Sequence, residues 1–234
     1  MPRLIAALVR HGQYRQLPDT PSAHQPFPLV AEGKTQALAG AAELRGLLGE
    51  HVLALHPQVD SSQLLRAWQT AQLMIEQLRD RLSAQSEVKC FDALAERSVG
   101  SAANLSIAQI EAILREDPRY PEPPANWKSD SDFRLPLQGA ESLMQAGERV
   151  ATHLRRQMAA LAENATVDTL KLFVGHGAAF RHAAFHLGTL AFDDIRKLSM
   201  YHARPVLLEY QVNDAWKHIA GEWKLRKPYN EFTD

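Results

Sequence analysis

Two short, mostly apolar segments, far apart in the chain, end in the same way. Residues 4–9 are followed by the triplet Arg-His-Gly, and residues 169–174 by Gly-His-Gly. An apolar run of this length that stops at a glycine is typical of a buried β-strand. Ligands bind at the carboxyl ends of the strands in open α/β sheets. If both segments are central strands of one parallel sheet, His11 and His176 meet at that edge.

Helical and strand patterns alternate along the rest of the chain. The first two expected helices are residues 32–48 and a helix that residues 61–71 lead into and that runs to about Leu82. A third is capped by Ser106, begins at Ile107 and ends before Pro118. A fourth is opened by residues 139–142 and runs to about Ala162, and the fifth covers residues 178–187. The other expected strands are the second half of residues 52–59, residues 87–90, residues 205–210 and residues 216–220. This alternation predicts an α/β fold with three layers, in which helices flank a mostly parallel central sheet. The 234 residues contain no evident linker, so we expect a single domain over residues 1–234.

One long segment fits neither pattern. Residues 117–139 contain five prolines together with Tyr120, Trp127 and Phe133. A loop of this length inside a compact domain is usually a functional lid or disordered. The aromatic side chains favour packing over disorder. We therefore expect a long irregular insertion, or lid, over about residues 100–139.

Composition limits the classes of partner and of site. A formal net charge of −1 gives no general attraction to nucleic acid or to anionic membranes, so neither is expected as a partner. Cys90 is the only cysteine, which rules out an internal disulfide and argues against a thiolate metal cluster. We expect Cys90 to pack as a small apolar side chain. The sequence has no recognisable signal peptide or membrane span, so a cytoplasmic location is expected.

Arg66 follows a predicted strand and begins a predicted helix. A planar guanidinium suits bidentate capture of a phosphate or carboxylate, and helix N-termini also favour anions. Taken alone, Arg66 reads as a solvated helix residue, and each histidine as an unrelated residue at a strand end. Taken together, Arg66, His11 and His176 indicate a site for an anion.

Several motifs, taken in chain order, carry a family resemblance. They are Arg10-His11-Gly12, residues 62–71 around Arg66, Leu94-Ala95-Glu96, Gly139-Ala140-Glu141-Ser142, and Gly175-His176-Gly177. This ordered set resembles the phosphoglycerate-mutase-like branch of the histidine phosphatase superfamily, and it covers nearly the whole chain.

The resemblance implies a role for each site residue. His11 would be the nucleophile that becomes a phosphohistidine. Arg10, Arg66 and His176 would hold the phosphoryl oxygens, and Glu96 would be the general acid. Phosphoryl transfer depends mainly on positioning and on stabilising the charge of the equatorial oxygens. Two guanidinium groups and a histidine supply this without a metal ion, so no metal and no cofactor are expected.

Two of these assignments stay open. A carboxyl group beside the phosphate can protonate the leaving alkoxide and then activate water, if its pKa is raised. Glu96 is the candidate by resemblance, and Asp92 lies close to it in sequence. Arg15 is either a substrate-binding residue or simply exposed. Acidic substrates are expected if Arg15, Arg97 or Arg134 faces the cleft.

The residues after the first motif bear on the reaction type. Mutases of this branch place small hydroxyl residues and an asparagine there, whereas this chain has Gln-Tyr-Arg-Gln at 13–16 and no asparagine before Asn104. Gln13 and Tyr14 are instead similar to the mitochondrial protein-phosphatase members. The leading hypothesis is a metal-independent phosphatase acting on a phosphorylated small molecule or phosphoprotein. The alternatives are a phosphomutase and a catalytically weak phosphoprotein-binding or scaffolding member.

Two other motifs point to weaker alternatives. The glycines around His176 begin like a dinucleotide-binding fingerprint, but Phe180 stands at the position of the third glycine. His182 and His186 have zinc-ligand spacing on a predicted helix, but Ala183 stands where a zinc protease has its glutamate. We therefore expect helix packing there and neither a nucleotide nor a metal.

Overall fold

The computed structural model describes residues 1–82 and 86–226. Its helices are α1 (Ala31–Glu50), α2 (Leu65–Gln77), α3 (Ile107–Glu116), α4 (Leu143–Asn164), α5 (Gly177–His186) and α6 (Phe192–Ile195). Its strands are β1 (Leu4–Arg10), β2 (Ala54–Leu55), β3 (Gln58–Ser62), β4 (Glu87–Phe91), β5 (Thr169–Gly175), β6 (Leu198–Met200), β7 (Pro205–Gln211), β8 (Ala215–Ala220) and β9 (Trp223–Leu225).

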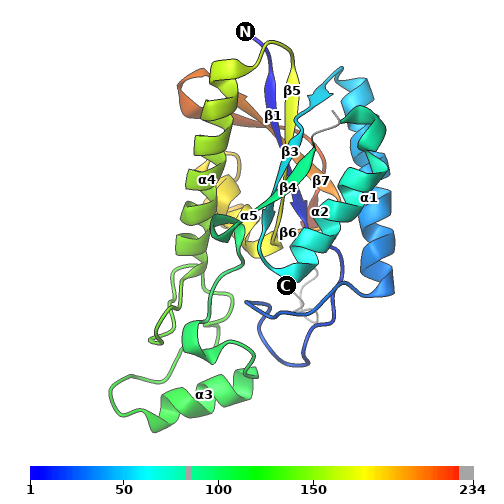
Figure 1. Ribbon diagram of the computed structural model, residues 1–234. Helices are drawn as coiled ribbons and strands as arrows, with labels where there is room; N and C mark the ends of the chain where they lie inside the picture. The colour runs from blue at the N-terminus through cyan, green and yellow to red at the C-terminus, as the bar shows by residue number, and fades with distance from the viewer. Residues whose placement is uncertain (83–85, 227–234) are drawn as a thin grey trace.

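The main sheet is mostly parallel. Its strand order is β4-β3-β5-β1-β7-β8, and the short β2 pairs with β5. Strands β1 to β5 pair in parallel, whereas β7 and β8 add an antiparallel margin. Helices α1 and α2 cover one face, and α4 and α5 cover the other (Figure 1). The structure thus confirms the predicted three-layer α/β fold.

The two faces of the sheet carry separate apolar cores. On one face, Ala37, Ala41 and Leu44 of α1 pack against β1 and β5. On the other, α4 buries Val150, Leu154 and Met158, which follow one another at intervals of four residues and so share one helical face. Because β1 and β5 are buried on both sides, β1 is a continuous apolar run, and β5 is one except for Thr169 at its start and the buried Lys171.

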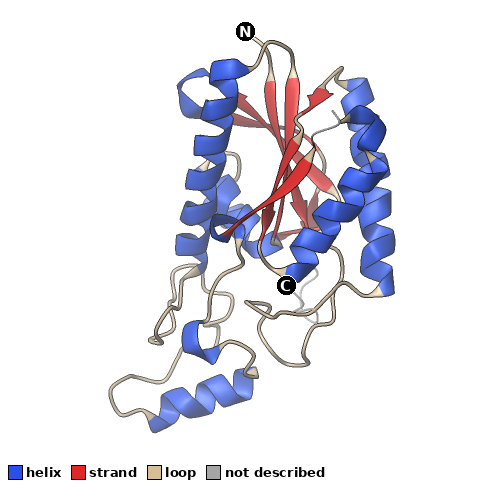
Figure 2. Cartoon of the chain, in the orientation of Figure 1, coloured by secondary structure: helices blue, strands red, loops and turns tan. Residues whose placement is uncertain are grey.

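The insertion has a small core of its own. It holds the fully buried Trp127 together with Ile110 and Leu114 of α3. Ser106 caps α3, as the sequence predicted, and the structure adds a capping box with Gln109. The insertion and the 11–30 loop both lie at the end of the sheet where β1 finishes, and loops are concentrated there (Figures 1 and 2).

Several sequence predictions were wrong in detail. Ser61 and Ser62 belong to β3 and not to the approach of a helix, because their backbones pair with β4. Helix α2 stops at Gln77, and a short 3-10 turn over Arg79–Arg81 follows it. Cys90 is exposed, because β4 is the edge strand of the sheet.

Three short elements near the C-terminus, α6, β6 and β9, carry too few residues for a periodic signal and were not predicted. Within the described residues, no helix combines the length and the apolar character that crossing a membrane requires.

Candidate active site

The two strand-end histidines lie side by side. Strands β1 and β5 are neighbours in parallel, and Arg10 is the register partner of Gly175. The next residue on each strand is a histidine, so His11 and His176 project from the same edge. Their ring centroids are 5.0 Å apart. Both side chains are almost completely buried.

Gly12 lets the chain turn away from β1 within a tight space. A Cβ at this position would lie 2.3 Å from the carbonyl oxygen of Gly33, at the start of α1. The Gly12 amide donates to Thr70 Oγ1 of α2 at 3.0 Å. The triplet after β1 is therefore held between two helices, which fixes the position of His11.

His11 is held as a neutral imidazole with one nitrogen available. Its Nδ1 donates to the carbonyl of Gly12 (2.7 Å), so Nε2 carries the lone pair and accepts from Arg66 Nε (3.1 Å). Burial lowers the pKa of His11 well below its usual value, and the charge of Arg66 lowers it further. A neutral imidazole with an unprotonated Nε2 is the form that can attack phosphorus.

Arg66 is the centre of the site. It is the second residue of α2 and is fully buried. Its Nη2 lies 3.3 Å from His176 Nδ1, on the same side as the Nε that reaches His11. Its Nη1 donates to the carbonyl of Gln25 and its Nη2 to the carbonyl of Ala23, both at 2.8 Å. Among the described residues, no carboxylate lies within ion-pair distance of this guanidinium.

Tyr14 closes one side of the site. Its ring meets the His11 ring edge-on, with centroids 5.3 Å apart. The guanidinium carbon of Arg66 lies 4.4 Å from the centre of the same ring, a cation–π contact. The Tyr14 hydroxyl is 3.0 Å from Ser22 Oγ. Tyr14 thus contacts His11 and the central arginine at once.

His176 is also neutral. It accepts from Arg66 at Nδ1, so its Nε2 donates to Ser62 Oγ at 2.9 Å. Burial lowers the pKa of His176 well below its usual value, followed by the charge of Arg66. Ser62 is the last residue of β3, so three parallel strands contribute to the site.

Arg10 lies on the opposite side of the histidines from α2. Its Nη1 donates to the carbonyl of Met200 at 3.1 Å. A Cβ at Gly177 would lie 3.0 Å from Arg10 Cδ, so the arginine passes directly over the start of α5. Its charge lowers the pKa of both His11 and His176.

The structure separates the two candidate acids. Glu96 is 3% exposed, whereas Asp92 is exposed. Glu96 Oε1 accepts from the backbone amide of Arg97 at 2.8 Å. Burial lowers the pKa of Arg66 and raises that of Tyr14. The Glu96 charge acts on both groups, which places this carboxyl within electrostatic reach of the site. This geometry favours Glu96 over Asp92.

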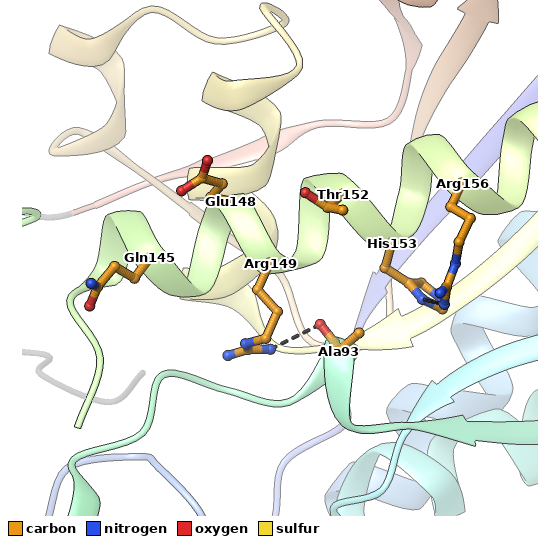
Figure 3. A pocket seen from close by; sticks show the side chains of 7 residues that line it. All are labelled: Ala93, Gln145, Glu148, Arg149, Thr152, His153 and Arg156. Carbon is orange, nitrogen blue, oxygen red and sulfur yellow. Dashed lines mark hydrogen bonds between the residues drawn. The ribbon is translucent and has the colours of Figure 1, made fainter. Parts of the chain in front are cut away.

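Arg149 of α4 holds the Glu96 loop in place. Its Nη1 donates to the carbonyls of Ala93 (2.9 Å) and Ala95 (3.1 Å), and its Nε and Nη2 each contact Glu141 at 2.8 Å. Figure 3 shows Arg149 pointing at the carbonyl of Ala93. Both residues line a pocket of about 450 Å³ beside α4. Neither His11 nor Arg66 lines this pocket, which is distinct from the histidine site.

The remaining arginines take different places. Arg15 and Arg134 are exposed. Arg97 is 7% exposed, with its guanidinium 6.0 Å from the centre of the Trp127 ring in the insertion. The structure thus groups His11, His176, Arg66 and Arg10, with Glu96 in electrostatic reach, whereas the role of Arg15 in substrate binding stays a prediction.

The histidine pair on α5 has other partners. His182 donates from Nδ1 to the carbonyl of Ala178 and contacts Ser131 Oγ with Nε2 (3.1 Å). His186 Nε2 instead lies 3.1 Å from the carbonyl of Met144. Burial lowers the pKa of His182 to about 3. No set of three metal-ligand side chains is grouped in the parts of the chain that the structure describes.

Sequence reasoning missed several residues that shape this site. Ser62, Thr70, Ala23, Gln25 and Arg149 contact it through hydrogen bonds to partners distant in sequence. The only local signal was at Ser62 and Thr70, which fall within the motif around Arg66. Nothing in the 17–29 loop marks Ala23 or Gln25 as partners of an arginine.

The comparison with protein families identifies the chain. The family model of the histidine phosphatase superfamily (branch 1) matches residues 6–219. This chain belongs to that superfamily. No curated protein matches it significantly.

Solved structures of the superfamily share the fold. Mycobacterial glucosyl-3-phosphoglycerate phosphatase with inorganic phosphate is 24% identical, with a TM-score of 0.64 over 97% of this chain and 96% of that chain. A structure named mycobacterial hydrolase 1 is also 24% identical, with a TM-score of 0.67 over 94% of this chain and 97% of that one. Phosphoglycerate mutase from Bacillus anthracis is 17% identical, with a TM-score of 0.69 over 94% of this chain and 93% of that one. The superfamily fold therefore carries both phosphatases and a mutase.

Proposed function

We propose that this histidine phosphatase superfamily member is a phosphomonoesterase that works through a phosphohistidine on His11. One observation carries the proposal: the unprotonated Nε2 of a neutral, buried His11 accepts a hydrogen bond from the buried guanidinium of Arg66. That arrangement places a nucleophile beside a cation able to hold the phosphoryl oxygens.

In the first step, a phosphoryl oxygen takes over the hydrogen bond that Arg66 Nε donates to His11. The freed His11 Nε2 lone pair then attacks phosphorus in line with the ester oxygen. The phosphorus–oxygen bond breaks, and the departing alkoxide takes a proton from the Glu96 carboxyl group. Arg10 and Arg66 hold the equatorial oxygens and stabilise their charge, and His176 joins them in the tautomer whose Nδ1 carries the proton while its Nε2 accepts from the Ser62 hydroxyl. The phosphoryl group is then bound to His11 Nε2.

In the second step, the Glu96 carboxylate removes a proton from a water molecule as its oxygen attacks phosphorus. The phosphorus–nitrogen bond breaks and its electron pair returns to His11. The products are inorganic phosphate and a neutral His11, and Glu96 has regained its proton. Every group needed for this cycle is a side chain of this protein, so the proposed reaction requires no metal ion.

The residues after Gly12 favour hydrolysis over mutase activity. A mutase must keep the phosphohistidine long enough to return the group to its product. Here Tyr14, in place of the hydroxyl and asparagine pattern of mutases, packs against both His11 and Arg66. A phosphorylated small molecule is the proposed substrate class, and glucosyl-3-phosphoglycerate phosphatase is one of the neighbours that supports it.

The test is hydrolysis of p-nitrophenyl phosphate by the purified protein in excess EDTA. We expect phosphate release and inhibition by vanadate, an analogue bound in one structure of the mycobacterial phosphatase. His11→Ala should lose at least about 10³-fold in kcat, because no nucleophile remains. His51→Ala, outside the site, is the matched control and should match the wild type. Full activity in His11→Ala would disprove the mechanism.

A panel of phosphorylated compounds then narrows the reaction and the substrate. Sugar phosphates, phosphoglycerates, nucleotides, phosphoserine and phosphopeptides are ranked by kcat/KM. Conversion of 3-phosphoglycerate to 2-phosphoglycerate faster than phosphate release would identify a mutase instead. Binding of phosphopeptides without formation of a phosphohistidine would identify a binding module.

A further inference from the structure

The guanidinium of Arg66 uses two different edges. One edge, made of Nε and Nη2, faces the two active-site histidines. The other, made of Nη1 and Nη2, donates to the backbone carbonyls of Gln25 and Ala23 at 2.8 Å each. A planar guanidinium can offer one edge to a phosphoryl group while the other stays bound. The carbonyl contacts therefore fix the plane and rotation of the edge that faces His11.

We call the carbonyl groups of Ala23 and Gln25 the carbonyl clamp. The clamp is braced by the side chain of Gln25, which is fully buried. Gln25 Oε1 accepts from the backbone amide of Leu17 at 3.0 Å, and Gln25 Nε2 donates to the carbonyl of Pro21 at 3.0 Å. Both bonds cross the loop, so one side chain sets the shape of residues 17–25.

The insertion also holds the clamp in place, through the side chain of Ala23. The Ala23 side chain is 1% exposed and belongs to the same apolar cluster as Ile110 and Trp127 of the insertion. The backbone amide of Ile107, which begins α3, donates to the carbonyl of Asp19 at 2.8 Å. Ala23 thus packs its side chain into the insertion while its carbonyl holds the central arginine of the site.

We propose that Ala23 and Gln25 are positioning residues for phosphoryl transfer: the carbonyl clamp orients Arg66, and the packing of the insertion on Ala23 sets the clamp. This inference rests on the proposed phosphatase function. The clamp touches neither substrate nor nucleophile, and it acts only through the arginine. Small misplacements of a catalytic group cost large factors in rate, because the geometry of the transition state is narrow.

The main test replaces Gln25 with methionine, which keeps the length of the side chain and removes both bracing hydrogen bonds. We expect Gln25→Met to weaken vanadate inhibition and inorganic phosphate binding by about tenfold. We also expect kcat/KM for p-nitrophenyl phosphate to fall by about 10- to 100-fold. Asn164→Leu is the control, because it also replaces an amide side chain by an apolar one of similar size and removes a side chain–backbone hydrogen bond, at the end of α4 and outside the insertion.

A double-mutant cycle with Arg66→Met separates positioning from general damage. If the clamp acts through Arg66, Gln25→Met changes phosphate affinity and kcat/KM little in the Arg66→Met background. Equal losses in both backgrounds would overturn the proposal, as would unchanged vanadate and phosphate affinity in the single variant. Ala23→Leu, which overfills the small core beside the clamp, should act in the same direction as Gln25→Met.

The wild-type protein distinguishes failure of the clamp from failure of the phosphatase proposal. If the wild type hydrolyses phosphate esters and Gln25→Met behaves identically, the clamp is wrong and the phosphatase proposal stands. If the wild type binds phosphate without hydrolysing any ester, the phosphatase proposal fails. Phosphate affinity, measured by calorimetry, then still supports or refutes the clamp. If it neither hydrolyses nor binds, both proposals fall.

Discussion

Two buried polar clusters lie along the same pair of strands, β3 and β5, and they differ in how their charges are balanced. The Asp60 cluster consists of Asp60, Gln58, His153 and Lys171. Asp60 accepts from Lys171 (2.8 Å) and Gln58 (2.7 Å) at Oδ1 and contacts His153 (2.9 Å) at Oδ2. Both Asp60 and Lys171 are almost fully buried, and each neutralises the other.

The active-site cluster is further along the same strands, where His176 follows β5 and Ser62 ends β3. Its central cation, Arg66, is held by neutral carbonyls and histidines and has no ion-pair partner among the described residues. A buried charge with its counter-charge in place is a structural element. A buried cation held by neutral acceptors is suited to an incoming anion. The contrast separates a cluster that supports the fold from one that can bind phosphate.

The largest effect is expected at Glu96, in the active-site cluster. Glu96→Gln should lower kcat for an alkyl phosphate such as glycerol phosphate by about 10²–10⁴-fold, because the alkoxide loses its proton donor. With p-nitrophenyl phosphate, whose leaving group needs no proton, a rapid-mixing measurement should still show a burst of p-nitrophenolate. Asp92→Asn is the control and should match the wild type. A loss of kcat in Asp92→Asn with unchanged kcat in Glu96→Gln would instead assign the general acid to Asp92.

The next effect is expected in the Asp60 cluster, on stability and not on catalysis. Asp60→Asn leaves the Lys171 charge buried without its partner, so the free energy of unfolding should fall by about 3–5 kcal/mol in urea titrations. Adding Lys171→Met should restore part of this loss, because the unpaired charge is then removed. The kcat of the folded fraction should stay within about twofold of the wild type. A large loss of kcat at unchanged stability would mean that the two clusters are not separate.

A further effect is expected from pH on the free energy of unfolding, because the fold keeps several histidines neutral. Burial lowers the pKa of His11 and His176 well below the usual value and that of His182 to about 3. As pH falls below about 6.5, the unfolded chain binds protons that the folded chain does not. Each such histidine therefore lowers stability by up to about 1.4 kcal/mol per pH unit, down to its own folded pKa.

Urea titrations between pH 4 and 8 measure this slope. His182→Gln should reduce the slope by up to about 1.4 kcal/mol per pH unit, the contribution of one buried neutral imidazole. An unchanged slope in this variant would show that His182 is not kept neutral by the fold. Above about pH 6.5 these histidines are neutral in both states and contribute no pH dependence.

The smallest effect is expected at Cys90, on the edge strand beside β3. Because its side chain is exposed, Cys90→Ser should change the free energy of unfolding by less than about 0.5 kcal/mol. A loss above about 1 kcal/mol, measured by the same titrations, would instead support the apolar packing that the sequence suggested.

Much of the fold followed from local patterns. The apolar runs of β1 and β5, the helical periodicity of α1 and α4, and the caps at Ser106 and Ser142 are signals within a few residues. The meeting of His11 and His176 needed only one further step, the pairing of two strands in parallel. Elements too short to show a period, such as α6 and β9, gave no such signal.

The sequence by itself determined the layers of the fold, the two histidines at the sheet edge, and the presence of Arg66 beside them. Only the tertiary structure decided which groups hold that arginine, which carboxyl lies near it, and which buried charges are already paired. Those decisions depend on contacts between distant residues, such as Arg66 with Ala23 and with His176, 43 and 110 positions apart. Hydrophobic periodicity specifies which side of a helix or strand is buried. It does not specify which polar group on another element a buried polar side chain will contact.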